Sequence, residues 1–221
     1  MPPTDPIQSS KRVLTPNERI SEILFGLIMV TTFTGSLSVA TAGRDDVRAM
    51  LIGAVGCNLA WGIIDAILYL MGCLAEKGHN LRTFRKVRSA ADHAAARLAI
   101  SGALPPLVAS VLQPEEFKAI HERLLQLPEP PRFVRLSKED WIGALGVFLL
   151  VFLATFPVVI PFLLMQSATP ALRVSNTIAV VMLFVLGYAF GRGVGHRPWL
   201  YAVSMVVLGV VLVALTIVLG G

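Results

Sequence analysis

Residues 51–74 read LIGAVGCNLAWGIIDAILYLMGCL, and this stretch decides the fold. It is 24 residues long, and its single charged side chain is Asp65. A helix of about 20 apolar residues crosses the hydrocarbon core of a bilayer, so the stretch predicts a membrane span. An ionisable side chain inside a span costs about 2.5–3.5 kcal/mol on insertion scales and needs a partner, a cavity or neutralisation. Asp65 is therefore the most informative residue of the chain.

The rest of the 221-residue chain has the same apolar character. Apolar residue types make up 55% of it and charged types only 15%, whereas soluble domains average about 25% charged residues. Residues 141–221 carry three charged side chains, all of them arginines. This composition predicts a polytopic membrane protein that lies in the lipid bilayer, and it excludes a disordered, collagen-like or disulfide-stapled chain.

Four further apolar windows predict membrane spans at residues 23–43, 141–165, 174–190 and 199–220. The first helix is expected to start before its apolar part, because Thr15-Pro16-Asn17-Glu18 has the pattern of a capping box with proline at the first helical position. We therefore predict an all-α membrane protein with five transmembrane helices.

The distribution of Lys and Arg predicts the orientation. With the N-terminus inside, 16 basic residues lie on the cytoplasmic side and three lie outside. The N-terminus is thus expected inside and the C-terminus outside. These topogenic residues also explain the net charge of +5, so no nucleic-acid partner is expected. No cleaved signal peptide is expected either, because the polar N-terminus lacks its pattern.

The predicted organisation has four parts: a polar N-terminal tail (1–15), transmembrane helices one and two (16–74), a cytoplasmic helical insert (75–140), and transmembrane helices three to five (141–221). Apolar residues at three- and four-residue steps predict one amphipathic helix early in the insert: Leu81, Phe84, Val87, Ala91, Ala95 and Leu98. The stretch from Ser101 to Pro106 is expected to break this pattern, and a second helix is expected to start at Pro114.

Helical spacing places Asn58, Trp61, Asp65 and Tyr69 along one side of the second span. A polar stripe inside a span indicates a pathway for a cation or a proton. The structural alternative is a protonated Asp65 that hydrogen-bonds to a neighbouring helix.

In the first helix, Glu18 lies one turn before Glu22, and Met29 lies two turns after it. Carboxylate oxygens suit hard cations and a thioether suits softer ones, so this mixture fits a transition metal better than calcium. The ordinary alternatives are a carboxylate at the membrane interface and a methionine that only packs. No arrangement of nucleophile and base stands out, so we expect neither an enzyme nor a cofactor.

The order of segments resembles the vacuolar iron transporter family of divalent-cation transporters. RISEILFGLIMV (19–30) is similar to its Asn-Asp-Gly-Leu stretch, and NLAWGIIDAILYL (58–70) is similar to its Gly-Glu-Tyr stretch. FLLVFLATFPVVIPFLL (148–164) is the closest match by eye, and LGVVLVALTIVLGG (208–221) resembles the closing pattern of the family.

The resemblance implies a homodimer in which helices one and two line the ion path. It also implies that Glu22 and Asp65 stand at the positions of the family's metal-binding carboxylates. Glu18, Met29, Asn58, Trp61 and Tyr69 are the expected lining residues. Trp61 stands where the family has a methionine, and the insert holds eleven basic against eight acidic residues, which makes it a poor collector of metal.

Two functions compete at this point. The first is a transporter, in a bacterial-type member of the family, that exports iron or manganese from the cytoplasm with proton exchange. The second is a non-transporting membrane protein of the same fold, whose basic insert binds anionic lipid or a protein partner. In both cases we expect a bacterial inner membrane.

Overall fold

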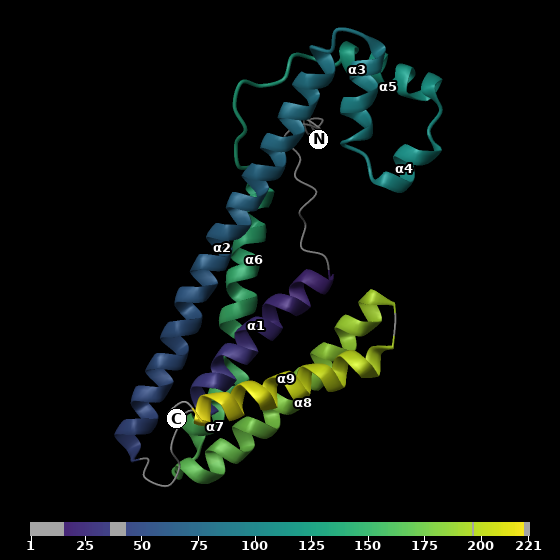
Figure 1. The fold of residues 1–221 in the computed structure, drawn as a ribbon. Coiled ribbons are helices and arrows are strands. Elements are labelled where there is room, and N and C mark those ends of the chain that lie inside the picture. The colour runs from purple at the N-terminus through teal and green to yellow at the C-terminus, as the bar shows by residue number, and fades with distance from the viewer. Residues whose placement is uncertain (1–15, 36–42, 196, 219–221) are drawn as a thin grey trace. The chain divides into compact units, whose positions relative to one another are not determined.

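The structure is a computed structural model, and it describes residues 16–35, 43–195 and 197–218. Within these ranges every regular element is an α-helix, so the predicted all-α class is confirmed. The helices (Figure 1) are α1 (Pro16–Gly35), α2 (Arg44–Arg88), α3 (His93–Ser101), α4 (Pro106–Val111), α5 (Pro114–Gln126), α6 (Lys138–Leu153), α7 (Phe156–Leu164), α8 (Ala168–Val194) and α9 (Pro198–Val218).

Three helical stretches in the described part of the chain are long and apolar enough to cross a membrane: Asp45–Arg88, Lys138–Leu164 and Ala168–Val194. Pro198–Leu212 forms a shorter apolar helix. The chain is thus an all-helical membrane protein with three candidate spans. The count of five spans stays a prediction, and residues 36–42, at the expected end of the first span, lie outside the described residues.

The described residues divide into two compact units. The insert unit holds Leu70–Trp141, and the membrane unit holds the residues up to Tyr69 together with those from Ile142 onward. α2 and α6 each belong partly to both units, because the boundaries fall inside these helices. Each unit has its own buried apolar cluster.

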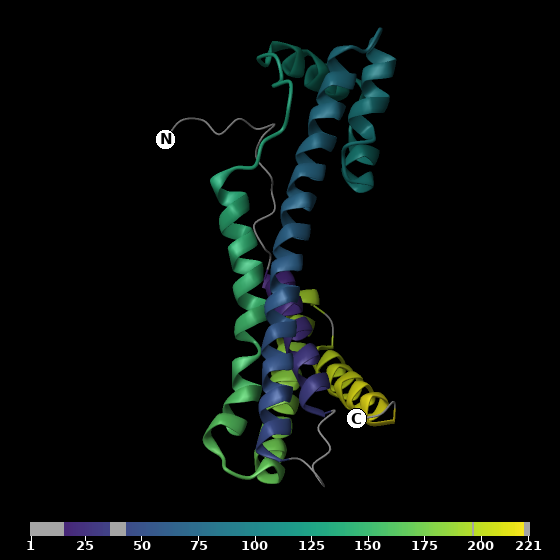
Figure 2. The ribbon, with the colours of Figure 1, turned by 90° about the vertical axis from the view of Figure 1, so that its left-hand side faces the viewer.

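The core of the membrane unit is formed by apolar side chains of α1, α2, α7 and α8, among them Leu27, Val30, Val158 and Leu183. α8 and α9 pack as an antiparallel pair (Figures 1 and 2). A Cβ atom on Gly187 would lie only 2.8 Å from the backbone oxygen of Tyr201. Small residues therefore let the two helix backbones approach closely, as is usual between membrane helices.

The core of the insert unit joins α2, α3 and α5 through Val87, Ala99, Ile100 and Phe117. α5 begins at Pro114 as predicted, and the Gln113 backbone N–H donates to Glu116 Oε2 at 2.7 Å in a capping box.

The prediction of one amphipathic helix through Leu98 is wrong. α2 ends at Arg88, and α3 starts anew at His93 because Asp92 Oδ1 accepts a hydrogen bond from the Ala95 backbone N–H at 2.7 Å. Leu98 consequently leaves the stripe and is 74% exposed, whereas Val87 is 2% exposed.

The stretch between Ser101 and Pro114 also differs from the prediction of a simple break. It contains the short helix α4, which begins with Pro106 at its first position. A proline there is compatible with a new helix, because the first turn needs no N–H donor from that residue.

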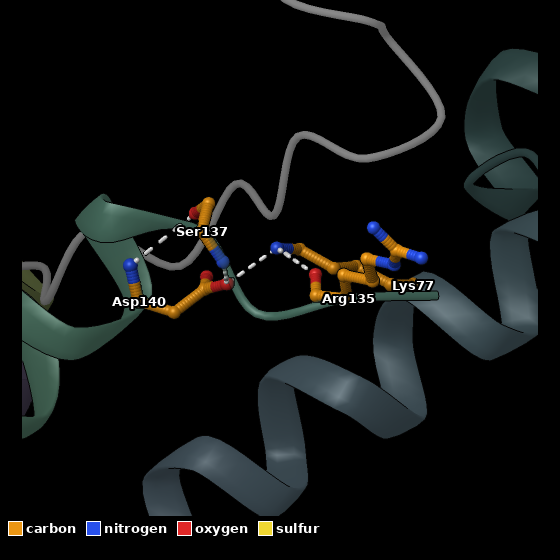
Figure 3. A network of polar contacts seen from close by, with 4 residues as sticks. All are labelled: Lys77, Arg135, Ser137 and Asp140. Atoms are coloured by element: carbon orange, nitrogen blue, oxygen red, sulfur yellow. Dashed lines mark hydrogen bonds and ion pairs between the residues drawn. The ribbon is translucent and has the colours of Figure 1, made fainter. Parts of the chain in front are cut away.

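A buried ion pair connects α2 to the start of α6 within the insert unit (Figure 3). Lys77 Nζ of α2 contacts Asp140 Oδ2 in the first turn of α6, and both side chains are fully buried. The same lysine donates to the Arg135 carbonyl at 3.2 Å, and Asp140 Oδ2 also accepts from the Ser137 backbone N–H at 2.7 Å. The pair is therefore satisfied by further hydrogen bonds, as buried charges require.

Two arginines of α2 hold the proline-rich segment that leads to α6. Arg85 donates to the carbonyls of Pro131 and Arg132 at 2.8 and 3.0 Å, and Arg88 donates to the carbonyl of Leu127 at 2.6 Å. These basic groups thus serve contacts inside the insert unit.

Candidate functional site

α1 and α2 meet at aromatic side chains close to the predicted carboxylates. The rings of Phe25 and Trp61 pack edge to face, with centroids 5.6 Å apart. On α2, Gly62 is buried, and a Cβ atom there would lie 3.1 Å from the Phe148 ring of α6. α2 therefore has α1 and α6 as neighbours within the membrane unit.

Asn58 connects three helices at this place. Its side chain is fully buried, and Nδ2 donates to the Gly26 carbonyl of α1 at 2.9 Å and to Thr155 Oγ1 at 2.6 Å. A Cβ atom on Gly26 would lie 2.5 Å from the Val151 carbonyl oxygen, so only glycine allows α1 to approach α6 this closely. The remaining oxygen of Asn58, Oδ1, is buried without a hydrogen-bond partner among the described residues.

Thr155 marks a break in the apolar stretch Lys138–Leu164. α6 ends at Leu153, and α7 begins at Phe156 with Pro157 in its first turn. Irregular backbone at membrane depth is tolerated where it is buried in protein, and at this break the buried Asn58 amide donates to the side-chain hydroxyl of Thr155. Thr155 is not among the residues predicted from the sequence; Pro157, two residues later and typical of a helix start, is the signal that could have indicated it.

The two predicted metal-binding carboxylates lie within interaction range of each other. Both side chains are half-buried, Glu22 on α1 and Asp65 on α2. The carboxylates of Asp65 and Glu18 are both close enough to Glu22 to repel it electrostatically. Asp65 Oδ2 is buried without a hydrogen-bond partner among the described residues.

The described part of one chain brings no three His, Cys, Asp or Glu side chains together as a metal-binding group. Its candidate site is thus a pair of carboxylates, Glu22 and Asp65, with Glu18 one turn away on α1. Two carboxylates leave most positions of a six-coordinate ion to water or to another chain.

The other predicted lining residues differ in environment. Tyr69 is buried, and its hydroxyl lies against Gly143 of α6. Trp61 is 38% exposed, and Met29 is half-buried on α1. Asn58 and Tyr69 therefore contact neighbouring helices, while Trp61 leaves part of its ring on the surface of the chain.

A cavity of about 510 Å³ opens at the start of α2 in the membrane unit. Its lining includes Asp45 and Arg48 of α2, together with residues 162–166 and the start of α8. Glu22 and Asp65 are not part of that described lining, so this cavity and the carboxylate pair are separate features.

Together, these features define a polytopic helical membrane protein with interacting carboxylates on neighbouring helices and a separate helical unit. The sequence profile of the VIT family matches residues 101–221, more than half of the chain, and the chain belongs to this family, the vacuolar iron transporter family. The resemblance seen in the sequence is confirmed. The family consists of membrane transporters of metal ions, not of enzymes.

The matched range extends from the end of α3 to the C-terminus. Glu22 and Asp65 lie outside it, so their assignment to the ion path stays a prediction. A comparison with curated proteins finds no match to this chain.

Proposed function

We propose that this protein exports a divalent metal ion, iron or manganese, from the cytoplasm in exchange for protons. Glu22 and Asp65 bind the ion or the exchanged protons, and the path lies at the interface of a homodimer. The observation that carries this proposal is the approach of two carboxylates on neighbouring helices of an apolar unit, one of them with a buried and unpartnered oxygen.

Coordination chemistry supports this choice of ion and assembly. Carboxylate oxygens suit divalent ions such as Mn²⁺ and Fe²⁺, and two like charges held close together are best neutralised by a cation or a proton. A homodimer supplies four carboxylates instead of two. Dimerisation would therefore complete a site for which one described chain offers only a pair.

The proposed placement follows from the distribution of charge. Five spans, with the N-terminus in the cytoplasm and the C-terminus outside, keep 16 of the 19 basic residues on the cytoplasmic side. The proposed membrane is the inner membrane of a bacterium.

The rival function, a basic insert that recruits anionic lipid or a protein partner without transport, has less support. Of the eleven basic residues in 75–140, Lys77 is buried in an ion pair, and Arg85 and Arg88 bind backbone carbonyls inside the insert unit. Fewer basic groups are then available to a partner than the sequence indicates.

Metal uptake into vesicles that contain the purified protein tests the proposal, with Fe²⁺, Mn²⁺, Co²⁺ and Zn²⁺ compared. We expect uptake of Mn²⁺ or Fe²⁺ by the wild type and its loss in Asp65→Asn and Glu22→Gln, because an amide can hydrogen-bond but cannot carry the charge or the exchanged proton. The control is Glu115→Gln, which makes the same chemical change on an exposed side chain of α5. Metal uptake at the wild-type level by the Asp65→Asn variant would show that Asp65 has a structural role and does not bind the ion.

A further inference from the structure

The interactions between α1 and α2 follow a regular order along the two helices. Taken along α1, the interacting pairs are Glu22 with Asp65, Phe25 with Trp61, Gly26 with Asn58, and Phe33 with Gly53. Residue numbers rise along α1 while those of the partners fall along α2. The two helices therefore run antiparallel where they meet.

The aromatic pair lies about one helical turn from the carboxylates on both helices. Phe25 is three residues after Glu22 on α1, and Trp61 is four residues before Asp65 on α2. Because the helices are antiparallel, both steps lead in the same direction. The two rings thus form an aromatic layer on one side of the carboxylate pair. With the N-terminus in the cytoplasm, this is the side toward the outer surface of the membrane.

The two sides of the carboxylate pair differ in exposure. Toward the start of α1, Glu18 and Ser21 are exposed. Beyond the aromatic layer, Asn58 is fully buried and donates to the Gly26 carbonyl of α1 at 2.9 Å. The carboxylates therefore lie next to exposed polar side chains on the cytoplasmic side and next to packed helices on the outer side.

Two aromatic rings in contact are a barrier to a hydrated cation. Their edges and faces offer no oxygen to replace the water that the ion must lose, and apolar constrictions close ion paths by excluding water. The rings are also free to move apart. Phe25 is half-buried and Trp61 is 38% exposed, so neither ring is fixed in the core, and one edge-to-face contact is a weak interaction.

We propose that Phe25 and Trp61 form the outer gate of the ion path. The aromatic layer separates the carboxylates of Glu22 and Asp65 from the outer side of the membrane, and the rings must part before an ion or a proton crosses. This inference rests on the proposed function, from which it takes the ion path and the orientation of the helices.

The access of a thiol reagent to the carboxylate position tests the gate. Glu22→Cys is made in the full-length chain after its two native cysteines, Cys57 and Cys73, are replaced by alanine. A membrane-impermeant methanethiosulfonate reagent is added to spheroplasts, which expose the outer side of the membrane, or to inverted vesicles, which expose the cytoplasmic side. The rate of labelling is measured in both preparations.

We expect Glu22→Cys to be labelled faster from the cytoplasmic side than from the outer side. Adding Phe25→Ala and Trp61→Ala should raise the rate of outer labelling several-fold, whereas Trp61→Phe, which keeps a ring, should leave it low. The matched control is Phe184→Ala with Trp199→Ala. These two residues form a pair between α8 and α9 with the same centroid distance, 5.6 Å.

Trp61→Ala alone, on the more exposed ring, repeats the test with a smaller change to the packing. Labelling from the cytoplasmic side at an unchanged rate shows that a variant is folded. An outer labelling rate that is equal with and without the aromatic pair overturns the gate, and so does an equal rise in the α8–α9 control. The proposal also fails if the aromatic pair limits labelling only from the cytoplasmic side.

The labelling assay requires no metal flux, so it separates the gate from the proposed function. If the aromatic pair controls labelling but the wild type takes up no metal into vesicles, the proposed function alone is wrong. If the wild type takes up metal but the aromatic pair does not affect labelling, the gate alone is wrong.

Discussion

Asn58 of α2 donates its side-chain amide to Thr155 Oγ1 at 2.6 Å, across 97 residues of sequence. Thr155 lies where α6 has ended and α7 has not yet begun. The same nitrogen also donates to the Gly26 carbonyl of α1. One buried side chain therefore connects α1, α2 and the break in a candidate membrane span.

Replacing Asn58 by alanine should destabilise the membrane unit. The substitution leaves the Gly26 carbonyl and the Thr155 hydroxyl without their donor in a buried place, and an unsatisfied buried polar group costs about 1–3 kcal/mol. Unfolding of the purified protein by titration with SDS measures the effect. Asn80→Ala, at an exposed position on the same helix, should change stability little. Equal stability of the two variants would contradict a structural role for the Asn58 contacts.

Adding one methyl group at Gly26 should also be destabilising. A Cβ atom there would lie 2.5 Å from the Val151 carbonyl oxygen, which is closer than van der Waals contact, so Gly26→Ala must push α1 away from α6. Overpacking of this kind costs about 1–3 kcal/mol. Gly56→Ala is the matched control on α2, because a Cβ atom there meets nothing within 4 Å. We expect the control to unfold at the wild-type SDS concentration or above it, since alanine favours a helix.

Breaking the Lys77–Asp140 pair should loosen the insert unit. Lys77→Met leaves the buried carboxylate of Asp140 without its cation, and removal of one partner from a buried pair typically costs about 3–5 kcal/mol. Limited proteolysis of the segment between α5 and α6 reports the effect. Lys86→Met removes the same charge at an exposed position of α2 and should not increase cleavage. The double variant Lys77→Met/Asp140→Leu should recover much of the resistance, because it leaves no unpaired charge.

The sequence predicts the helical class and the candidate site residues because charges are conspicuous in an apolar chain. Asp65 can be predicted as a site residue without a structure, since an ionisable side chain inside an apolar span is costly, and Glu22 is predicted through the resemblance to the family. The electrostatic repulsion between these two carboxylates, in contrast, could not be predicted from the sequence. It depends on how α1 crosses α2, which local spacing does not determine.

The contacts of Asn58 could not be predicted from the sequence either, because they too depend on how the helices pack against one another. Its spacing from Asp65 places the two residues on one side of α2, but its partners come from α1 and from Thr155. Those contacts depend on the close approach of backbones at Gly26, a tertiary property.

The errors in the insert have local causes. The pattern of apolar and polar residues continues without a visible gap through Ser89, Ala90 and Ala91. The sequence pattern therefore does not reveal that Asp92 caps a new helix, α3. α4 is only six residues long and begins at the second of two consecutive prolines, which are read more easily as a break than as a helix start.

The predicted topology can be tested by reporters at the two ends of the chain. With 16 basic residues on one side and three on the other, a reporter after Gly221 should be active only outside the cytoplasm, and one before Met1 only inside. Alkaline phosphatase and green fluorescent protein fusions make this comparison. Activity of both ends on the cytoplasmic side would contradict an odd number of spans.

Trp61→Met should change which metal the protein carries. Trp61 stands next to Phe25 and four residues, about one helical turn, before Asp65, so a thioether at this position can join the carboxylates as a ligand. Thioether sulfur favours softer ions, whereas Mn²⁺ prefers oxygen. We therefore expect uptake of Co²⁺ and Zn²⁺ to rise several-fold relative to Mn²⁺ in vesicles that contain the variant. Competition between pairs of metals in one assay measures this ratio directly.

Trp61→Leu is the control that distinguishes the effect of a new sulfur ligand from the effect of the space left by the indole ring. Both substitutions remove the indole ring and its edge contact with Phe25, which is worth about 0.5–1.5 kcal/mol beyond the buried area, so both should lower stability to a similar degree. Trp61 is 38% exposed, and neither change is expected to prevent folding. Leucine supplies no sulfur and should leave the ratio of Co²⁺ to Mn²⁺ uptake at the wild-type value. If leucine shifts the ratio as far as methionine does, the size of the indole ring controls selectivity, and residue 61 is not a ligand position.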